Sequence, residues 1–192
     1  KIMANEKEIR TKIGSVKNTQ KITKAMEMVA ASKMRRTQET MKKSLPYADK
    51  IRGVIGHIFK ANPDYKHPFL VERKVKSAGY IVVSSDKGLC GGLNVNMFRP
   101  FIAHLKEQKS NNIKTKLCLV GAKGVQFFRS LDVNVVAATT NLGEEPLVED
   151  LVGAIKIMLD EYTEGKIDQL FIVHNNFVNT MSQKPEIKTL LP

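Results

Sequence analysis

A glycine-rich segment spanning residues 84–94 contains the residue types in this sequence that most suggest chemistry. It reads SSDKGLCGGLN and follows an apolar run at residues 79–83. Turns that lead from a strand into a helix often hold phosphate, because the helix N-terminus presents free backbone N–H groups. However, Gly88, Gly91 and Gly92 match neither the P-loop spacing nor the dinucleotide-binding fingerprint. We therefore predict a tight strand-to-helix turn without a nucleotide, and a nucleotide-binding Rossmann-type enzyme remains an alternative.

Cys90 in this segment is the one candidate nucleophile, since a thiol at a helix N-terminus can have a lowered pKa. All four histidines lie far from it in the sequence: His57, His67, His104 and His174. A Cys–His dyad would therefore depend on the fold. The second cysteine, Cys118, forms no CxxC motif with Cys90, which argues against a disulfide framework or a metal ribbon. We expect no catalytic residue, no metal and no cofactor.

The positive charge is concentrated at one end of the chain. The formal net charge is +12, and residues 1–60 hold 15 Lys/Arg against 5 Asp/Glu. A basic segment of this kind can bind the phosphates of nucleic acid. Against that alternative, no aromatic residue precedes Tyr47, and no helix-turn-helix or zinc motif is present. Lysines solvated on a long helix are the commoner explanation.

The same segment has the composition of one long helix. Residues 5–43 contain no proline and a single glycine, Gly14, and they are rich in good helix formers. Pro46 is expected to kink or interrupt the helix near Ser44. The apolar pattern then resumes and stops at Asn62 and Pro63. About 55 residues at a rise of ~1.5 Å give a rod on the order of 80 Å long.

Two faces of this helix carry apolar residues. A heptad seam with a-and-d spacing runs through Ile9, Ile13, Val16, Gln20, Thr23, Glu27, Ala30 and Met34. A second apolar group, formed by Ile22, Met26 and Val29, lies well away from the seam on a helical wheel. A helix that is apolar on more than one face is usually enclosed by neighbours.

Beyond residue 62, strand-like runs alternate with helix-like runs, which predicts an α/β domain over residues 63–192 with a mostly parallel sheet. We expect strands at residues 79–85, 116–120, 134–138 and 170–173, with a possible extension at 177–179 and an edge strand at 186–192. Helices are expected at residues 94–109, 122–130 and 147–162. No apolar stretch approaches the ~20 residues needed to span a bilayer, so we expect no membrane insertion.

Three sequence motifs closely resemble the gamma subunit of the F-type rotary ATP synthase, in the form found in proteobacteria. The first is EIRTKI at residues 8–13 followed by NTQKITKAMEMVAASKM at residues 18–34, which is similar to the family's N-terminal helix. The second is SDKGLCGGLN at residues 85–94, similar to a family signature that includes Asp86, Lys87, Gly88, Cys90, Gly91 and Gly92. The third is NTMSQ at residues 179–183. The resemblance runs along essentially the whole chain.

The resemblance implies a non-catalytic rotor subunit. Residues 1–62 would be half of an antiparallel coiled coil, kinked near Pro46, standing in a ring of alpha and beta subunits. The α/β domain would be a Rossmann-like three-layer domain that contacts epsilon and the membrane c-ring. It further implies a peripheral location at the cytoplasmic face of the inner membrane, without nucleic acid.

The resemblance also assigns two sets of contact residues on the helix. Those on the coiled-coil seam are Ile9, Ile13, Val16, Gln20 and Thr23. Those facing the collar of alpha and beta subunits are Lys21, Ile22, Lys24, Met26, Val29, Met34, Arg35 and Arg36.

The chain departs from the family pattern at its two ends. The family's second long helix lies at the C-terminus and has no counterpart before Pro192, so we expect a fragment. Met3 has the character of an initiator, which would make Lys1 and Ile2 additions.

Overall fold

The computed structural model describes residues 6–61, 67–143 and 146–192 of the chain. The chain divides into two units, Lys1–Tyr65 and Lys66–Pro192. The expected initiator Met3, the expected helix start at Asn5 and the expected stop at Asn62 and Pro63 lie outside the described residues.

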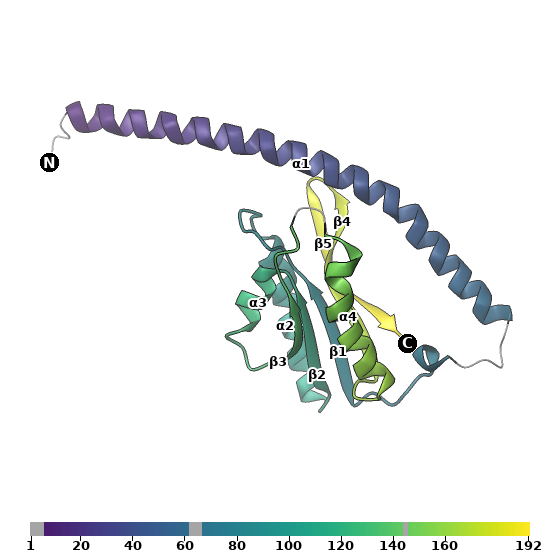
Figure 1. Cartoon of the computed structure of the whole chain (residues 1–192). Helices are drawn as coiled ribbons and strands as arrows, with labels where there is room; N and C mark the ends of the chain where they lie inside the picture. The colour runs from purple at the N-terminus through teal and green to yellow at the C-terminus, as the bar shows by residue number, and fades with distance from the viewer. Residues whose placement is uncertain (1–5, 62–66, 144–145) are drawn as a thin grey trace. The chain divides into compact units, whose positions relative to one another are not determined.

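The first unit contains one helix, α1 (Glu6–Ala61), of 56 residues. Glu6 and Glu8 lie in its first turn, where negative charge interacts favourably with the helix dipole. Pro46 lies inside the helix, and helical structure continues on both sides of it. Of the expected kink or interruption near Ser44, the interruption does not occur, because the helix continues although Pro46 has no backbone donor. A kink at Pro46 stays a prediction. Figure 1 shows α1 curving along its length.

The second unit is built on a five-stranded sheet with the order β3-β2-β1-β4-β5. The strands are β1 (Ser77–Val83), β2 (Lys114–Val120), β3 (Asn134–Thr139), β4 (Gln169–Asn179) and β5 (Ser182–Leu191). Strand β1 pairs in parallel with β2 and β4, and β2 pairs in parallel with β3. Only β5 is antiparallel, to β4. The predicted α/β class with a mostly parallel sheet is confirmed.

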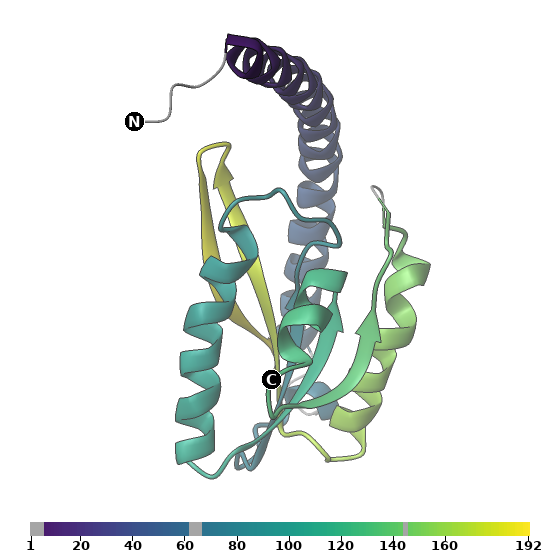
Figure 2. The same cartoon turned by 90° about the vertical axis from the view of Figure 1, so that its left-hand side faces the viewer.

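Three helices cover the two faces of this sheet, as Figure 2 shows for α2 and α4. Helices α2 (Leu93–Ser110) and α3 (Ala122–Phe128) pack on one face through a cluster that includes Phe98, Phe101 and Phe128. Helix α4 (Val148–Thr163) packs on the other face through Met158 and Tyr162. A short 3-10 turn, η1 (Pro68–Leu70), was not predicted from the sequence. The predicted helices match these three within a few residues.

The C-terminal strands form a longer hairpin than the sequence indicated. The two expected pieces, at residues 170–173 and 177–179, are one strand, and the expected edge strand begins at Ser182 instead of Glu186. Polar side chains in the middle of β4 hid this continuity. Asn175 keeps its place there because its amide donates to the Leu93 carbonyl at 3.1 Å. The NTMSQ motif forms the hairpin turn, where the Asn179 side chain accepts from the Met181 N–H at 2.9 Å.

Candidate functional site

The seam predicted on α1 is an exposed row of side chains in its own unit. Ile9, Ile13 and Val16 have 48%, 51% and 64% of their surface exposed. Gln20 and Thr23 continue the row and are also exposed. Aliphatic side chains that are about half exposed at regular spacing still have apolar surface that a partner can bury. Their assignment to a coiled coil stays a prediction.

The second apolar face belongs to a longer stripe on α1 that carries few charges. Ile22, Met26 and Val29 are 61%, 51% and 54% exposed. Hydroxyl side chains extend this face in both directions along the helix at spacings of three and four residues, and Lys33 lies between the apolar residues and the later hydroxyls. The whole stripe consists of Thr11, Ser15, Thr19, Ile22, Met26, Val29, Lys33, Thr37, Thr40 and Ser44. Sequence analysis found the three apolar members and missed the hydroxyl ones.

Most hydroxyls of this stripe donate to the carbonyl four residues earlier in their own helix. Thr11 donates to Lys7 at 2.9 Å and Thr19 to Ser15 at 3.0 Å, while Thr37, Thr40 and Ser44 repeat the pattern further along. A hydroxyl bonded in this way has already used its one donor. The stripe therefore presents methyl groups and acceptor oxygens more than hydrogen-bond donors.

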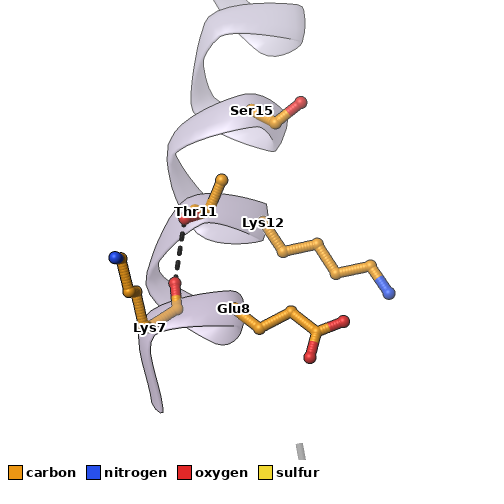
Figure 3. A pocket seen from close by; sticks show the side chains of 5 residues that line it. All are labelled: Lys7, Glu8, Thr11, Lys12 and Ser15. Carbon is orange, nitrogen blue, oxygen red and sulfur yellow. Dashed lines mark hydrogen bonds between the residues drawn. The ribbon is translucent and has the colours of Figure 1, made fainter. Parts of the chain in front are cut away.

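The start of the stripe appears in Figure 3, where the Thr11 hydroxyl bonds to the Lys7 carbonyl and Glu8, Lys12 and Ser15 project from the helix. These five residues line a shallow surface hollow. All five belong to a single helix, so the hollow is a gap between neighbouring side chains and not an enclosed ligand site.

The basic residues predicted to face a collar are mostly solvated. Lys21 and Lys24 are exposed. Arg35 pairs with Glu39 at 3.4 Å, an exposed pair one helical turn apart. Such pairs contribute only about 0.3–0.5 kcal/mol, so the charge of Arg35 remains available for a partner of opposite sign. Met34 and Arg36 are also exposed.

The glycine-rich turn is held together by Asp86, whose carboxylate accepts three backbone N–H groups. Oδ1 accepts from Ala122 at 2.8 Å and from Asn141 at 3.1 Å, and Oδ2 accepts from Leu142 at 2.7 Å. Burial opposes ionisation, but these bonds and the neighbouring Lys87 charge outweigh it, so the pKa of Asp86 lies below its usual value. Asp86 thus ties the turn after β1 to the start of α3 and to the loop after β3.

These contacts bear on nucleotide binding at the start of α3, not at the N-terminus of α2, into which the glycine-rich turn leads. The Ala122 N–H at the start of α3 is taken by the Asp86 carboxylate, and the next N–H, that of Lys123, donates to the Ser85 carbonyl. A phosphate at the start of α3 would have to displace a carboxylate of like charge. The absence of a nucleotide in the glycine-rich turn stays a prediction, which rests on the spacing of its glycines.

A second set of contacts packs the turn against β2 so closely that only glycine fits. Ser84 Oγ donates to the Val120 carbonyl at 3.0 Å and accepts from the Gly124 N–H at 2.8 Å. Gly121 has φ of 96°, and a Cβ at that position would lie 2.2 Å from the Ser84 carbonyl oxygen. Glycine at this position is therefore required by structure, without reference to a ligand.

Cys90 is half-buried, and its contacts are polar side chains of the same turn. The Asn94 amide lies 3.4 Å from the sulfur and also donates to Ser85 Oγ at 2.8 Å. In the described part of the chain, three of the four histidines have contacts elsewhere: His67 accepts from the Phe69 N–H at 3.2 Å, His104 bonds to Tyr80 at 2.9 Å, and His174 lies 3.9 Å from Glu186. The geometry favours a structural role for Cys90 over the dyad hypothesis.

Four other residues of the turn are exposed to solvent: Lys87, Gly88, Gly91 and Gly92. Gly91 has φ of 57°. The strand-to-helix turn was predicted from the sequence, whereas the contacts of the Asp86 carboxylate were not. These contacts join residues up to 56 positions apart, and no local pattern indicates such a contact.

Across residues 6–61, 67–143 and 146–192, no cluster of three or more His, Cys, Asp or Glu side chains is placed to hold a metal ion. Within the same ranges, no helix combines the length and the apolar character that crossing a membrane requires.

Comparison with protein families gives one match over nearly the whole chain. The model of the ATP synthase family matches residues 5–192.

Solved structures provide a second comparison. A chain of the mitochondrial ATP synthase central stalk and c-ring from Tetrahymena thermophila matches with a TM-score of 0.65 and 26% identity, covering 89% of this chain and 72% of that one. Two chains from the Euglena gracilis mitochondrial ATP synthase, one from its rotor and one from its OSCP/F1/c-ring assembly, match with TM-scores of 0.61 at 20% identity. Each match covers 95% of this chain but only 61% and 56% of those chains. The Euglena matches support the fold alone.

Proposed function

This chain belongs to the ATP synthase family as a gamma subunit, the non-catalytic rotor component of the central stalk, and from that premise we propose how its two units divide the work. Helix α1 is the shaft that the alpha and beta subunits surround. The α/β unit is the base that contacts epsilon and the c-ring. Rotation of the c-ring turns the base, and the shaft carries that torque to the catalytic sites.

The observation that carries this proposal is the surface of α1. One 56-residue helix carries an exposed aliphatic seam and a separate stripe of hydroxyl and apolar residues. Its basic residues include Lys17, Lys21 and Lys24. A second helix would cover the seam, and the stripe and the basic residues would meet the surrounding collar. The positive charge suits acidic loops of the beta subunits.

Asymmetry is the physical basis of the mechanism. A helix with an aliphatic, a low-charge and a basic side presents a different surface to each site of the surrounding ring. A rotor shifts the equilibrium of a site only as far as its contact energies differ between the open and closed states. Turning α1 exchanges these surfaces among the sites, and binding and release of nucleotide follow on the other subunits.

Two other functions are less well supported. Against a nucleotide-binding enzyme, the spacing of Gly88, Gly91 and Gly92 matches neither phosphate-binding motif, and the Asp86 carboxylate takes the Ala122 N–H at the start of α3. For a nucleic-acid-binding protein, α1 offers basic residues but no aromatic side chain before Tyr47 on which bases stack.

We also propose the finer points of assignment. The close likeness of residues 18–34 and 85–94 to the proteobacterial form supports a bacterial F-type enzyme. In that setting the partners are the alpha, beta and epsilon subunits and the c-ring, and the location is the cytoplasmic face of the inner membrane.

The test is co-purification from cells that co-express the tagged chain with alpha, beta and epsilon subunits, followed by mass spectrometry of the captured proteins. The chain is expected to retain all three. Ile22→Asp combined with Val29→Asp is expected to reduce recovery of alpha and beta but leave epsilon, because epsilon contacts the other unit.

The matched control for that experiment is Val148→Asp combined with Val152→Asp, which adds the same two charges at exposed positions of α4 in the other unit. Equal loss of alpha and beta in the control would contradict the assignment of the stripe. Failure of the unmodified chain to retain any of the three subunits would contradict the proposed function. Retention of duplex DNA with a steep salt dependence would favour the nucleic-acid alternative.

A further inference from the structure

A groove on the α/β unit has an apolar floor and a basic rim. It lies between the C-terminal half of α2, the start of β2 and the segment before β3. Leu105, Ile113 and Val133 contribute apolar surface, and Lys106, Lys109 and Lys114 are exposed around it. Asp132 is the single acidic residue among those lining the groove; its side chain is fully exposed and lies 3.9 Å from Lys109. The groove therefore combines hydrophobic surface with a net positive charge.

The groove lies beside the start of β3, an edge strand of the sheet. This edge lacks the residues that usually prevent an edge strand from pairing with another chain. Within the described residues, β3 pairs only with β2, and its sequence NVVAAT contains no proline and no charged residue. The opposite edge, β5, carries Pro185 with Lys184 and Lys188. Proline and lysine are the residues by which natural edge strands avoid pairing with other chains. The two edges of one sheet are thus built differently, and β3 is the one left open.

We infer that β3 and the adjoining groove form a docking site for an acidic, extended segment of a partner protein, which adds a sixth strand to the sheet. Backbone groups of the added strand would pair with the free edge of β3. Alternate apolar side chains would enter the groove at its Val133 end, and carboxylates would meet Lys106, Lys109 and Lys114. This site lies on the second unit and does not depend on the proposed role of α1.

The backbone of β3 identifies a residue whose donor faces the open edge. The Thr139 carbonyl accepts from the Gly121 N–H on the β2 side at 2.9 Å. Neighbouring residues of a strand direct their backbone groups to opposite sides, so the Ala138 N–H faces away from β2. Ala138 is exposed. Proline at this position removes a donor to the added strand and spares the ladder with β2.

Charge favours this occupant over a second copy of the chain. Pairing of two copies through β3 would bring together two groove rims, each with Lys106, Lys109 and Lys114 against a single Asp132, and these rims repel each other. An acidic strand is attracted to the same edge and would neutralise the basic rim.

The experiment uses the full chain labelled with 15N and a short synthetic peptide that alternates glutamate with valine. A twin peptide that alternates lysine with valine has the same strand propensity and the opposite charge. The glutamate peptide is expected to shift the amide signals of Val135 to Ala138 and of Lys109 and Lys114. Ala138→Pro, and separately Lys109→Glu with Lys114→Glu, are each expected to weaken binding at least about tenfold, or ~1.4 kcal/mol.

Matched controls separate docking from loss of structure. Ala138→Ser keeps the backbone donor, and Lys156→Glu reverses an exposed charge on α4; both are expected to bind as the unmodified chain does. If Ala138→Pro loses the dispersed amide spectrum, the double lysine variant decides the question. The inference is overturned if the lysine peptide binds equally well or if the glutamate peptide produces no shifts at millimolar concentration. It is also overturned if sedimentation finds a dimer of the chain alone that Ala138→Pro abolishes.

Discussion

At the scale of single residues, Asp86 does the most to shape the glycine-rich turn. Its carboxylate replaces water for three backbone N–H groups that belong to two other segments. Hydrogen bonds to a charged acceptor contribute about 1.5–3 kcal/mol each where a partner would otherwise be left unsatisfied. The composition of the glycine-rich turn resembles that of a ligand site, but the contacts of Asp86 show that the turn connects three segments of the fold.

Asp86→Asn tests that connection. The amide keeps one acceptor oxygen and places an NH2 group against a backbone donor, so we expect a loss of about 2–3 kcal/mol in the free energy of unfolding. Urea unfolding followed by circular dichroism measures the change. Asp132→Asn is the control. The Asp132 carboxylate is exposed, and its ion pair with the exposed Lys109, at 3.9 Å, contributes little to stability. A loss of equal size in the control would contradict the role of Asp86.

Asp86 also predicts a dependence of stability on acid. Its pKa in the folded chain is lowered, so its contribution is complete above the unfolded value of about 3.9 and is lost as the pH falls through the folded value. The unmodified chain is expected to lose stability below about pH 4, and Asp86→Asn to lose less over the same range. Parallel pH profiles for the two proteins would show that other carboxylates dominate.

The buried pair of Tyr80 and His104 predicts a second pH effect, near neutrality. Tyr80 Oη and His104 Nε2 are 2.9 Å apart. Burial lowers the pKa of His104, more than the nearby Glu107 raises it, and burial raises the pKa of Tyr80 to about 12. Both groups are therefore neutral at pH 7, and the tautomer of the imidazole decides which of them donates. Protonating His104 places a positive charge beside the buried Tyr80.

We expect stability to fall as the pH drops from about 6.5 toward the lowered pKa of His104, because the unfolded chain then binds the extra proton. Urea unfolding between pH 7 and pH 5 measures this, and His104→Gln should flatten the profile. His57→Gln, at an exposed position of α1, should leave it unchanged. A His104 signal that titrates at or above 6.5 by NMR would refute the assignment.

At the scale of elements, α1 contains a segment where its hydrogen bonding is weakened on two sides. Thr37, Thr40 and Ser44 share carbonyls of the helix ladder, and Pro46 leaves the Lys42 carbonyl without its usual donor. The three hydroxyls lie on one side of the helix and Pro46 on the opposite side. Thr19 and Thr23 share carbonyls near residue 20 in the same way, so it is Pro46 that is expected to make the turns near residue 42 open more readily than those near residue 20.

Pro46→Ala restores one backbone bond and removes a ring clash, worth up to about 3 kcal/mol of local helix stability. Slower amide hydrogen exchange is expected across residues 40–50 and is measured by mass spectrometry of peptide fragments. Ser32→Ala, an exposed change in the same helix outside that segment, should have little effect there. Unchanged exchange in Pro46→Ala would mean that the proline is not what weakens these turns.

The elements themselves could be predicted from the sequence because their signals are local. Apolar spacing marks α2 and α4, and short apolar runs mark β1 and β2. The sheet order could not be predicted, since neighbouring strands are chosen by packing between residues far apart. Strand β4 was divided in two because His174 to Asn176 are polar, although backbone pairing with β5 holds them in the sheet. The contacts of Asp86 were missed for the same reason of distance along the chain.

At the scale of the whole molecule, the two units differ in charge as well as in structure. Residues 1–60 carry 15 Lys/Arg and 5 Asp/Glu, while residues 61–192 carry 16 and 14. The basic character therefore belongs to the helix that a collar of other subunits is proposed to enclose. Long-range attraction to acidic loops would guide assembly, and it weakens as salt screens the charges.

Met26 is where this charge arrangement makes the sharpest prediction for coupling. It is 51% exposed on the low-charge stripe, between Ile22 and Val29. Methionine is flexible and repacks readily, which suits a surface that must move past its neighbours. Met26→Lys adds a charge that can bond to a carboxylate of a beta subunit, at about 1.5–3 kcal/mol. That bond must break at every rotational step.

We therefore expect complexes that contain the Met26→Lys subunit to assemble normally and to pump fewer protons for each ATP hydrolysed. Proton pumping into membrane vesicles is measured alongside ATP hydrolysis on the same preparation. Met28→Lys is the matched control: it makes the same substitution two residues along, at a side chain that is 63% exposed on the other side of the helix. Because that side already carries Lys17, Lys21 and Lys24, one more positive charge there should change the ratio little. An unchanged ratio in Met26→Lys, or an equal fall in both variants, would remove Met26 from the contact between rotor and collar.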